Sequence, residues 1–299
     1  MPDAIERRVR TGRAMAGALA ALTITVAAGS AAAAERTTVR FPSLDAAHTA
    51  IEGALFRPDR PGRLPAVVMM HGCSGLYTKS GRMQTNLAAW FDRFAQWGYV
   101  VLAVDGFNPR GFRSICETGK RPLDEIDDRP FDVYGALDWL AAQPFVRADR
   151  VALVGWSNGA MATLAAIDAR APAQFGASRH RFRTAAAFYP GCIRIAQRGD
   201  WRPYPKLLVL VGLADDWTQP RPCLRLIEAV RDAGAPAEIV GFEGAYHAFD
   251  HPKLKLRERS ARNDSWRKSE RTVHIGSDPA ARAESIRRLE GFLAETLRD

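Results

Sequence analysis

The chain has 299 residues, of which 47% are hydrophobic and 25% are charged, and its formal net charge is +9. These values are ordinary for a globular protein, and they exclude a disordered or collagen-like chain. A chain of this length can bury a full core without support from metal ions or disulfides.

The first 34 residues have the pattern of a targeting segment. Several arginines open it, and an apolar, alanine-rich run extends from Ala14 to Ala34. Its last three alanines fit a small-x-small cleavage site before Glu35, as in a secretory signal peptide. We therefore predict a signal peptide over 1–34, a mature domain over 35–299 and a periplasmic or secreted protein. An uncleaved anchor helix is the alternative, and no second apolar run is long enough to predict a membrane span after cleavage.

Apolar runs of strand length alternate with helical patterns along the mature chain. The strand-like runs are 37–41, 48–58, 65–70, 99–107, 150–156, 184–190, 206–212 and 237–244, and the clearest helical patterns are 85–98, 131–143, 223–234 and 278–297. The first two strands alternate and favour antiparallel pairing, whereas the continuous Val/Leu/Ile runs indicate strands buried on both faces. We expect Ser277 to cap the last helix. The pattern predicts an α/β fold of one domain, with a mostly parallel central sheet and helices on both faces.

A Gly-x-Ser-x-Gly pattern follows the strand-like run that ends at Trp156. Gly155, Ser157 and Gly159 form it, and a helix of small residues comes next. This pattern is typical of a sharp strand-to-helix turn that exposes a nucleophilic serine. A serine that caps a helix on a glycine turn is the alternative reading.

A nucleophilic serine needs a base and an acid that orients the base. His247 follows the last core strand, so it is the first candidate for the base, and His251 is the second. Asp215 follows the preceding strand and is the first candidate for the acid. For Asp216 we expect a solvated position or a bond to the turn backbone.

Two backbone N–H groups should form an oxyanion hole. Asn158 follows the nucleophile and supplies one of them. The other comes from the loop after the strand at 65–70, where Cys73 is the first candidate and Ser74 the second. A nucleophilic role for Cys73 itself is a weaker alternative, because an exported cysteine is more often bridged.

Six segments together resemble the α/β-hydrolase fold and, more narrowly, the dienelactone hydrolase family. They are Met70–Tyr77, Asp105–Gly111, Gly155–Ala160, Phe188–Cys192, Gly212–Pro220 and Gly244–Asp250. The resemblance implies a Ser157–Asp215–His247 triad, an acyl-enzyme mechanism without a metal or organic cofactor, and a small-molecule ester or lactone as substrate. The best-known members carry cysteine where this chain has Ser157, and a serine favours general ester hydrolysis. A peptidase or amidase on the same fold and a non-catalytic binding protein are the rival readings.

Four further residues are candidates for binding the substrate. Arg110 follows a core strand and could bind a substrate carboxylate, with Arg113 as a second possibility. For these arginines, however, ion pairs to the acidic stretch 123–128 are the interpretation that we favour. Trp156, Trp217 and Tyr246 flank the triad candidates and could line an acyl pocket, although aromatic packing would also explain them.

The cysteines and a basic run leave two questions open. Three disulfide pairings are possible among Cys73, Cys116, Cys192 and Cys223, and no CxxC spacing indicates a metal site. Loss of residues 1–34 removes four arginines and two acidic residues, which lowers the net charge from +9 to +7. Much of this charge lies in 253–271, which we interpret as a solvated face without a nucleic-acid partner. The oligomeric state stays open.

Overall fold

The computed structural model describes residues 36–118, 121–175, 179–261 and 270–298, so the predicted signal peptide lies outside the described residues. The strands are β1 Thr37–Pro42, β2 Ala50–Phe56, β3 Leu64–Met70, β4 Val100–Asp105, β5 Val146–Trp156, β6 Thr184–Phe188, β7 Lys206–Gly212, β8 Ala237–Phe242, β9 Arg257–Ala261 and β10 Arg271–Ile275. The helices are α1 Thr85–Gln96, the 3₁₀-helix η1 Asn108–Arg110, α2 Arg129–Ala141, α3 Asn158–Ala166, α4 Ala171–Gln174, α5 Ile193–Ala196, α6 Pro220–Asp232 and α7 Pro279–Leu297.

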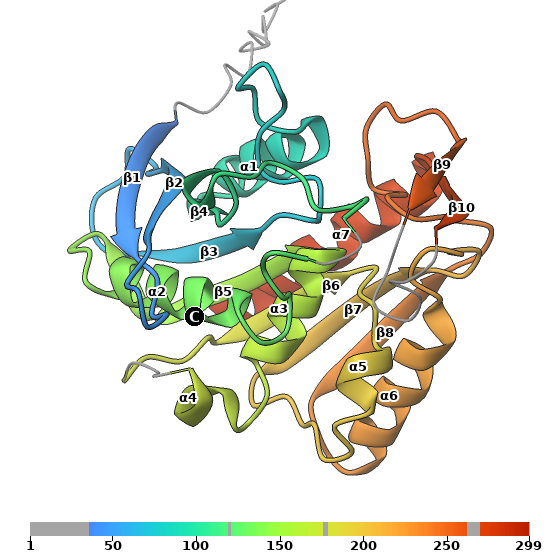
Figure 1. Ribbon diagram of the computed structural model, residues 1–299. Coiled ribbons are helices and arrows are strands. Elements are labelled where there is room, and N and C mark those ends of the chain that lie inside the picture. Colours follow the sequence, from blue (N-terminus) through green and yellow to red (C-terminus); the bar gives the residue numbers. More distant parts are fainter. Residues whose placement is uncertain (1–35, 119–120, 176–178, 262–269, 299) are drawn as a thin grey trace, which may run out of the picture. The chain divides into compact units, whose positions relative to one another are not determined.

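Eight strands form one mixed sheet in the order β1-β2-β4-β3-β5-β6-β7-β8 (Figure 1). β1 pairs antiparallel with β2, and β2 pairs antiparallel with β4. All further neighbours pair in parallel. This arrangement confirms the predicted α/β fold with its mostly parallel sheet and antiparallel opening strands. The carboxyl ends of the parallel strands meet at one edge, where sites in such sheets form.

The two faces of the sheet are covered by different helices. Side chains that alternate along β3 divide between them: Val68 and Met70 pack with residues of α2, α3 and α6, whereas Val67 and Met69 pack with residues of α1 and α7. Strands apolar on both faces therefore require a helix layer on each side, and Figure 1 shows these layers. Within the described residues, no helix combines the length and apolarity needed to cross a membrane.

A two-stranded antiparallel hairpin, β9–β10, stands apart from the main sheet. The hairpin lies partly within the basic run that we interpreted as a solvated face, and residues 262–269 between its strands are outside the described part. Its apolar side chains, Ala261, Val273 and Ile275, pack on Trp217 and on the loops that follow β3 and β4. The charged residues of the run that the structure describes are mostly exposed, as the solvated-face interpretation predicts, whereas Ala261, Val273 and Ile275 cover a small apolar cluster at the carboxyl edge.

The cap of α7 also differs from the sequence prediction. Asp278, not Ser277, is the N-cap, and its side chain accepts a hydrogen bond from Ala281 N at 2.9 Å. Ser277 Oγ instead accepts a hydrogen bond from Leu254 N at 2.8 Å. Ser277 therefore ties the segment before the hairpin to the start of α7.

Candidate active site

The turn between β5 and α3 holds Ser157 in a strained backbone conformation. Its φ is 53°, a value that costs free energy in a residue with a side chain. A side chain at Gly155 would collide with the carbonyl of Gly159, and one at Gly159 would collide with the carbonyl of Met70. Both glycines are therefore required by close backbone packing. The turn places Ser157 at the carboxyl edge of the sheet, next to the first turn of α3.

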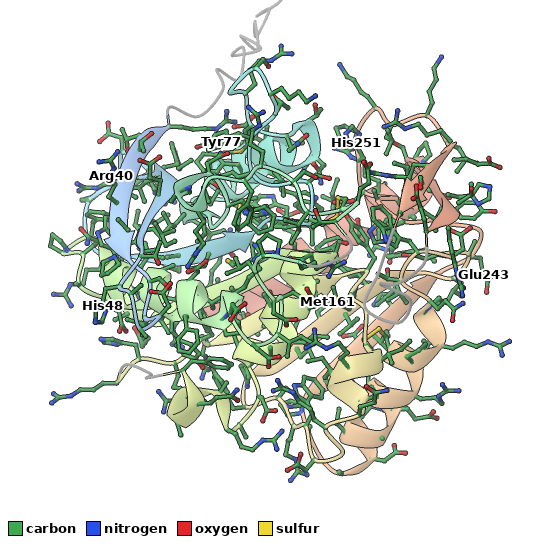
Figure 2. The ribbon with its side chains drawn as sticks, in the orientation of Figure 1. Arg40, His48, Tyr77, Met161, Glu243 and His251 are labelled. Atoms are coloured by element: carbon green, nitrogen blue, oxygen red, sulfur yellow. A yellow bond between two sulfur atoms is a disulfide. The ribbon has the colours of Figure 1, made fainter. Side chains whose placement is uncertain are left out.

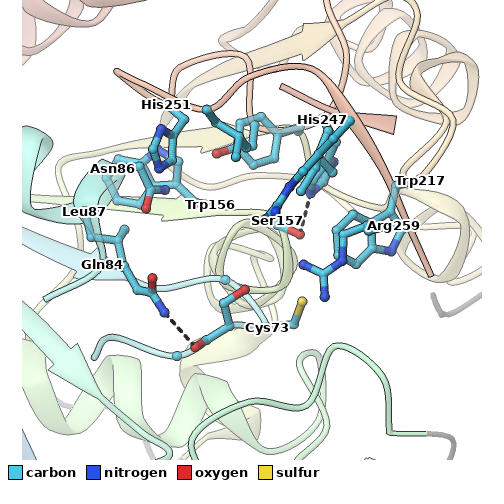
Figure 3. A pocket seen from close by; sticks show the side chains of 18 residues that line it. Cys73, Gln84, Asn86, Leu87, Trp156, Ser157, Trp217, His247, His251 and Arg259 are labelled. Carbon is cyan, nitrogen blue, oxygen red and sulfur yellow. Dashed lines mark hydrogen bonds between the residues drawn. The ribbon is translucent and has the colours of Figure 1, made fainter. Parts of the chain in front are cut away.

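Ser157, His247 and Asp215 form a continuous hydrogen-bonded chain. His247 Nε2 lies 3.0 Å from Ser157 Oγ (Figure 3). His247 Nδ1 lies 2.7 Å from Asp215 Oδ2. Asp215 and His247 are each 3% exposed, so water scarcely competes for these bonds. The geometry suits the transfer of a proton from the serine hydroxyl to the imidazole.

The two second candidates from the sequence lie in other environments. Asp216 binds His274, through the His274 backbone N–H at 2.9 Å and through Nδ1 at 2.7 Å. This pair links the β7 loop to β10, and the Asp216 side chain is 40% exposed, so it is partly solvated as expected but bonds to β10 and not to its own turn. His251 lines the pocket but does not contact Ser157, and its Nδ1 accepts a bond from Lys253 N. Figure 2 labels both His251 and His48, and the exposed His48, in the β1–β2 turn, lies on another part of the molecule.

Thr218 is a part of the site that the sequence analysis missed. Its hydroxyl lies 2.9 Å from Asp215 Oδ2 and 3.1 Å from His247 Nδ1. The other oxygen of Asp215 accepts the backbone N–H groups of Trp217 and Thr218. These bonds fix the carboxylate in the orientation that faces the imidazole. An aspartate followed three residues later by threonine is a turn signal that could have pointed to this contact.

The loop after β3 passes directly beside the serine. A side chain at Gly72 would lie 3.5 Å from Ser157 Cβ, and Cys73 lines the same pocket. Cys73 is bonded to Cys116, and Cys192 to Cys223, which answers the open question of pairing. Because its sulfur is bridged, Cys73 offers no thiolate as a nucleophile. The disulfide ties the loop that carries Cys73 to the loop after β4.

A cavity of about 180 Å³ opens above Ser157. Its walls come from the loop after β3, from α1, from the loops after β5 to β8 and from the hairpin (Figure 3). Trp156, Trp217 and Tyr189 contribute aromatic surface, and Arg257 and Arg259 contribute positive charge. No aspartate or glutamate occurs among the described residues that line it. Within the same described ranges, no group of three acidic, histidine or cysteine residues is arranged to hold a metal ion.

Behind the pocket, a buried carboxylate gathers three aromatic side chains. Asp250 accepts hydrogen bonds from Trp90 and Trp156 at 2.7 and 2.9 Å and from the Tyr189 hydroxyl at 2.7 Å. Burial raises the pKa of Asp250, although these three donors oppose the shift. Trp156 therefore lines the pocket, and its indole N–H is fixed by the hydrogen bond to Asp250. Tyr189 is held in the same way, with its ring centroid 4.5 Å from that of His247.

Two of the four predicted substrate-binding residues lie outside the pocket lining. The Arg110 guanidinium makes paired contacts with Asp132 at 2.8 and 2.9 Å and one contact with Asp45 at 2.9 Å. Ion pairing was the favoured interpretation for Arg110, but the partners are not the acidic stretch 123–128. Tyr246 stacks against His274, with ring centroids 5.1 Å apart. The structure brings only Trp156 and Trp217 of the four into the pocket.

Sequence comparison places the protein among known hydrolases. The Dienelactone hydrolase family matches residues 51–274. The chain belongs to this family. A curated relative from Bradyrhizobium sp., "Probable 2-oxo-3-(5-oxofuran-2-ylidene)propanoate lactonase", is 28% identical over 209 residues, which cover 65% of this chain and 77% of the relative. As a dienelactone hydrolase family member with a lactonase relative, the protein is a hydrolase that acts on ester bonds.

Solved structures share the fold at lower sequence identity. The dienelactone hydrolase-like promiscuous phosphotriesterase P91 from metagenomic libraries superposes with a TM-score of 0.63 at 20% identity, covering 87% of this chain and 98% of its own. Thermogutta terrifontis esterase 2 gives 0.58 at 17% identity, with 89% and 97% covered. Pyrococcus horikoshii acylaminoacyl peptidase gives 0.62 at 15% identity, and this chain covers 42% of it. These likenesses support the fold and span several hydrolase activities.

Proposed function

We propose that the protein cleaves carboxylic esters or lactones through an acyl-enzyme formed on Ser157. The observation that carries this proposal is the hydrogen-bonded chain from Ser157 through His247 to Asp215 at the base of a cavity. His247 takes the proton of Ser157 as its oxygen attacks the carbonyl carbon. Asp215 and Thr218 hold the imidazole in the tautomer that accepts at Nε2.

Negative charge then develops on the carbonyl oxygen of the substrate. In our proposal the backbone N–H groups of Cys73 and Asn158 stabilise it, since Asn158 follows Ser157 directly and Cys73 lines the same pocket. His247 returns the proton to the leaving alcohol, or to the ring oxygen as a lactone opens. Water then attacks the acyl-enzyme with His247 again as base, and Ser157 is released. Every proton transfer in this cycle uses the chain's own side chains.

The charge of the pocket favours substrates that carry an anionic group. Arg257 and Arg259 line it without a lining acid among the described residues, although Arg259 also contacts Glu117 at 2.9 Å. The name of the Bradyrhizobium relative's substrate, a propanoate, describes a carboxylate. We therefore propose a carboxylate-bearing ester or lactone as the preferred substrate. The peptidase or amidase reading remains the second candidate, because peptidases occur among the structural neighbours.

The decisive experiment compares residues 35–299 with the Ser157→Ala variant on p-nitrophenyl esters, lactones and matched amides. We expect ester and lactone turnover that falls by about 10⁴-fold or more in the variant. A fluorophosphonate probe should label Ser157 stoichiometrically, as read by mass spectrometry. Unchanged turnover in Ser157→Ala, or no labelling, would refute the nucleophile. Faster cleavage of amides than of esters would favour the peptidase reading.

We also propose that the protein is exported and that its signal peptide is cleaved before Glu35. Two disulfides are compatible with an oxidising compartment. N-terminal sequencing of the protein from a periplasmic or culture fraction should read from Glu35. A cytoplasmic protein that retains Met1 would contradict this proposal.

A further inference from the structure

A buried arginine lies beneath the proposed oxyanion hole. Arg129 is the first residue of α2, and it is 0% exposed. Its Nη1 donates to the carbonyl oxygen of His71 at 2.8 Å and to the side-chain oxygen of Asn158 at 2.5 Å. A single nitrogen thus joins the loop after β3 to the turn that carries Ser157.

Both contacts lie next to the groups that would stabilise the oxyanion. His71 lies two residues before Cys73, and Asn158 is itself the second expected donor of a backbone N–H. The Asn158 amide is held from its other side as well, because Nδ2 donates to Glu125 at 3.1 Å. Asn158 and Glu125 are 1% and 0% exposed, so water does not loosen this arrangement.

Stability alone gives a poor account of this arginine. Among the described residues, Arg129 Nε and Nη2 have no hydrogen-bond partner, and a buried, incompletely paired charge usually costs folding free energy. Burial lowers the pKa of Arg129 to about 10, so the guanidinium remains charged at neutral pH. The guanidinium also contacts the face of the Phe107 ring, with Cζ 5.1 Å from the ring centroid. This cation–π contact offsets only part of the cost of burying the charge. An apolar side chain would fill this space at lower cost if packing were the only requirement.

We propose that Arg129 is a positioning residue that sets the spacing of the two oxyanion-hole N–H groups, on the basis of the serine hydrolase function proposed above. It does not touch the substrate. It fixes the Cys73 loop relative to the Asn158 turn, and a shift of about 1 Å between catalytic groups costs about 100-fold in rate. The effect should therefore appear in the transition state and leave binding of the substrate nearly unchanged.

The test compares Arg129→Met, Arg129→Lys and Asn158→Ala, with rates expressed per active site titrated by a fluorophosphonate. We expect kcat to fall about 10- to 100-fold in Arg129→Met and Asn158→Ala, with KM within about threefold, because one donor is displaced but retained. The shorter cation introduced by Arg129→Lys would keep the charge and reach one acceptor, so this variant should recover part of the rate. A trifluoromethyl ketone, whose adduct places an oxyanion in the hole, should lose affinity by the same factor as kcat.

Arg110→Met is the matched control. Arg110 is another arginine with a largely buried side chain, which pairs with Asp132 at 2.8 Å and Asp45 at 2.9 Å. Its hydrogen bonds within the described part of the chain do not reach His71, Asn158 or Glu125. Its replacement should lower stability and leave kcat within about twofold. If Arg129→Met is poorly folded, Asn158→Ala removes the same contact and leaves the arginine in place.

Three outcomes would overturn the inference. They are an unchanged kcat per titrated site in folded Arg129→Lys and Asn158→Ala, a loss confined to KM, and an equal loss of kcat in Arg110→Met. Failure of the proposed function looks different, because Ser157→Ala would then remain active and the wild type would not be labelled. The two failures are therefore distinguishable.

Discussion

The two sides of Ser157 are built in opposite ways. Below it, His71, Glu125, Arg129 and Asn158 form a floor in which every side chain is at most 1% exposed. Above it, the β9–β10 hairpin forms a roof whose Arg257 and Glu258 are exposed and whose ion pairs face water. The floor fixes geometry through buried bonds, whereas the roof presents charged side chains that are largely exposed to water. We infer that the chemistry depends on the floor and that substrate choice depends on the roof.

Asp215 and Asp216, adjacent in the chain, give the sharpest test of this division. Asp215 holds His247, and Asp216 holds the hairpin through His274. Asp215→Asn should lower kcat about 10⁴-fold, because an amide favours the wrong imidazole tautomer. Asp216→Asn should change kcat/KM by less than about fivefold. Steady-state kinetics on one ester measures kcat and kcat/KM for both variants. Comparable losses of activity in the two variants would contradict the division between the floor and the roof.

The two disulfides provide a second matched pair. They close loops of similar length, with sequence separations of 43 and 31 residues, so each contributes about 4 kcal/mol in the chain-entropy model. Only Cys73–Cys116 adjoins the pocket. Replacing both of its cysteines by alanine should lower kcat per active site about 10-fold, whereas the Cys192/Cys223 double variant should lose stability alone. Denaturant unfolding and active-site titration measure the two effects, and equal kcat values would contradict the expectation.

The roof should govern the charge of the preferred substrate. Arg259→Gln should raise KM about 10-fold for a carboxylate-bearing ester, because a hydrogen bond to a charged group contributes about 1.5 kcal/mol or more. KM for a neutral ester of the same size should stay unchanged. Arg225→Gln, an exposed position on α6, is the control for net charge alone. An equal change for both esters would remove the proposed role of the hairpin.

The smallest predicted effect is a pH dependence of protein stability that comes from His71, a residue of the floor. Burial, followed by the nearby Arg129 charge, holds the pKa of His71 well below its ordinary 6.5. The unfolded chain takes up a proton near pH 6.5 and the folded protein does not. The stability contributed by His71 is therefore full above pH 6.5 and is lost as the pH falls below it.

His71→Asn should remove this part of the acid sensitivity. Urea unfolding at pH 7.5 and pH 5 measures it, with His48→Asn as the control at an exposed histidine. The same pH dependence in His71→Asn and the wild type would show that His71 does not contribute.

Sequence reasoning found the residues of the candidate triad because a strand pattern pointed to each of them. Ser157, Asp215 and His247 each follow a strand-like run, and parallel strands bring such positions to one edge, so their proximity could be predicted. Their catalytic roles stay predictions. Arg129 could not be found in this way, because a charged residue in the first turn of a helix is usually solvated. Its burial depends on three separate segments that meet in space.

The roof was missed for a different reason. Neither RERSA nor RTVHI has the continuous apolar pattern of a core strand, and their pairing depends on contacts with Trp217 and the disulfide loop. The sequence pattern therefore indicated that Arg257 and Arg259 were surface residues, and it did not point to the pocket that they line. For Arg110 the favoured ion pairing is found, but its partners could not be predicted, since Asp45 and Asp132 lie 65 and 22 residues away in the chain.

The junction between the hairpin and the site has a consequence for how such enzymes diversify. Gly276 N–H donates to the carbonyl oxygen of His247 at 3.1 Å, and a side chain at Gly276 would collide with Leu256. The chain is thus fixed to the backbone of His247 directly after the hairpin. Substitutions within the hairpin that keep this contact should therefore leave the position of His247 unchanged. Exchanging hairpins at this boundary is accordingly a route by which one catalytic scaffold could acquire new substrates.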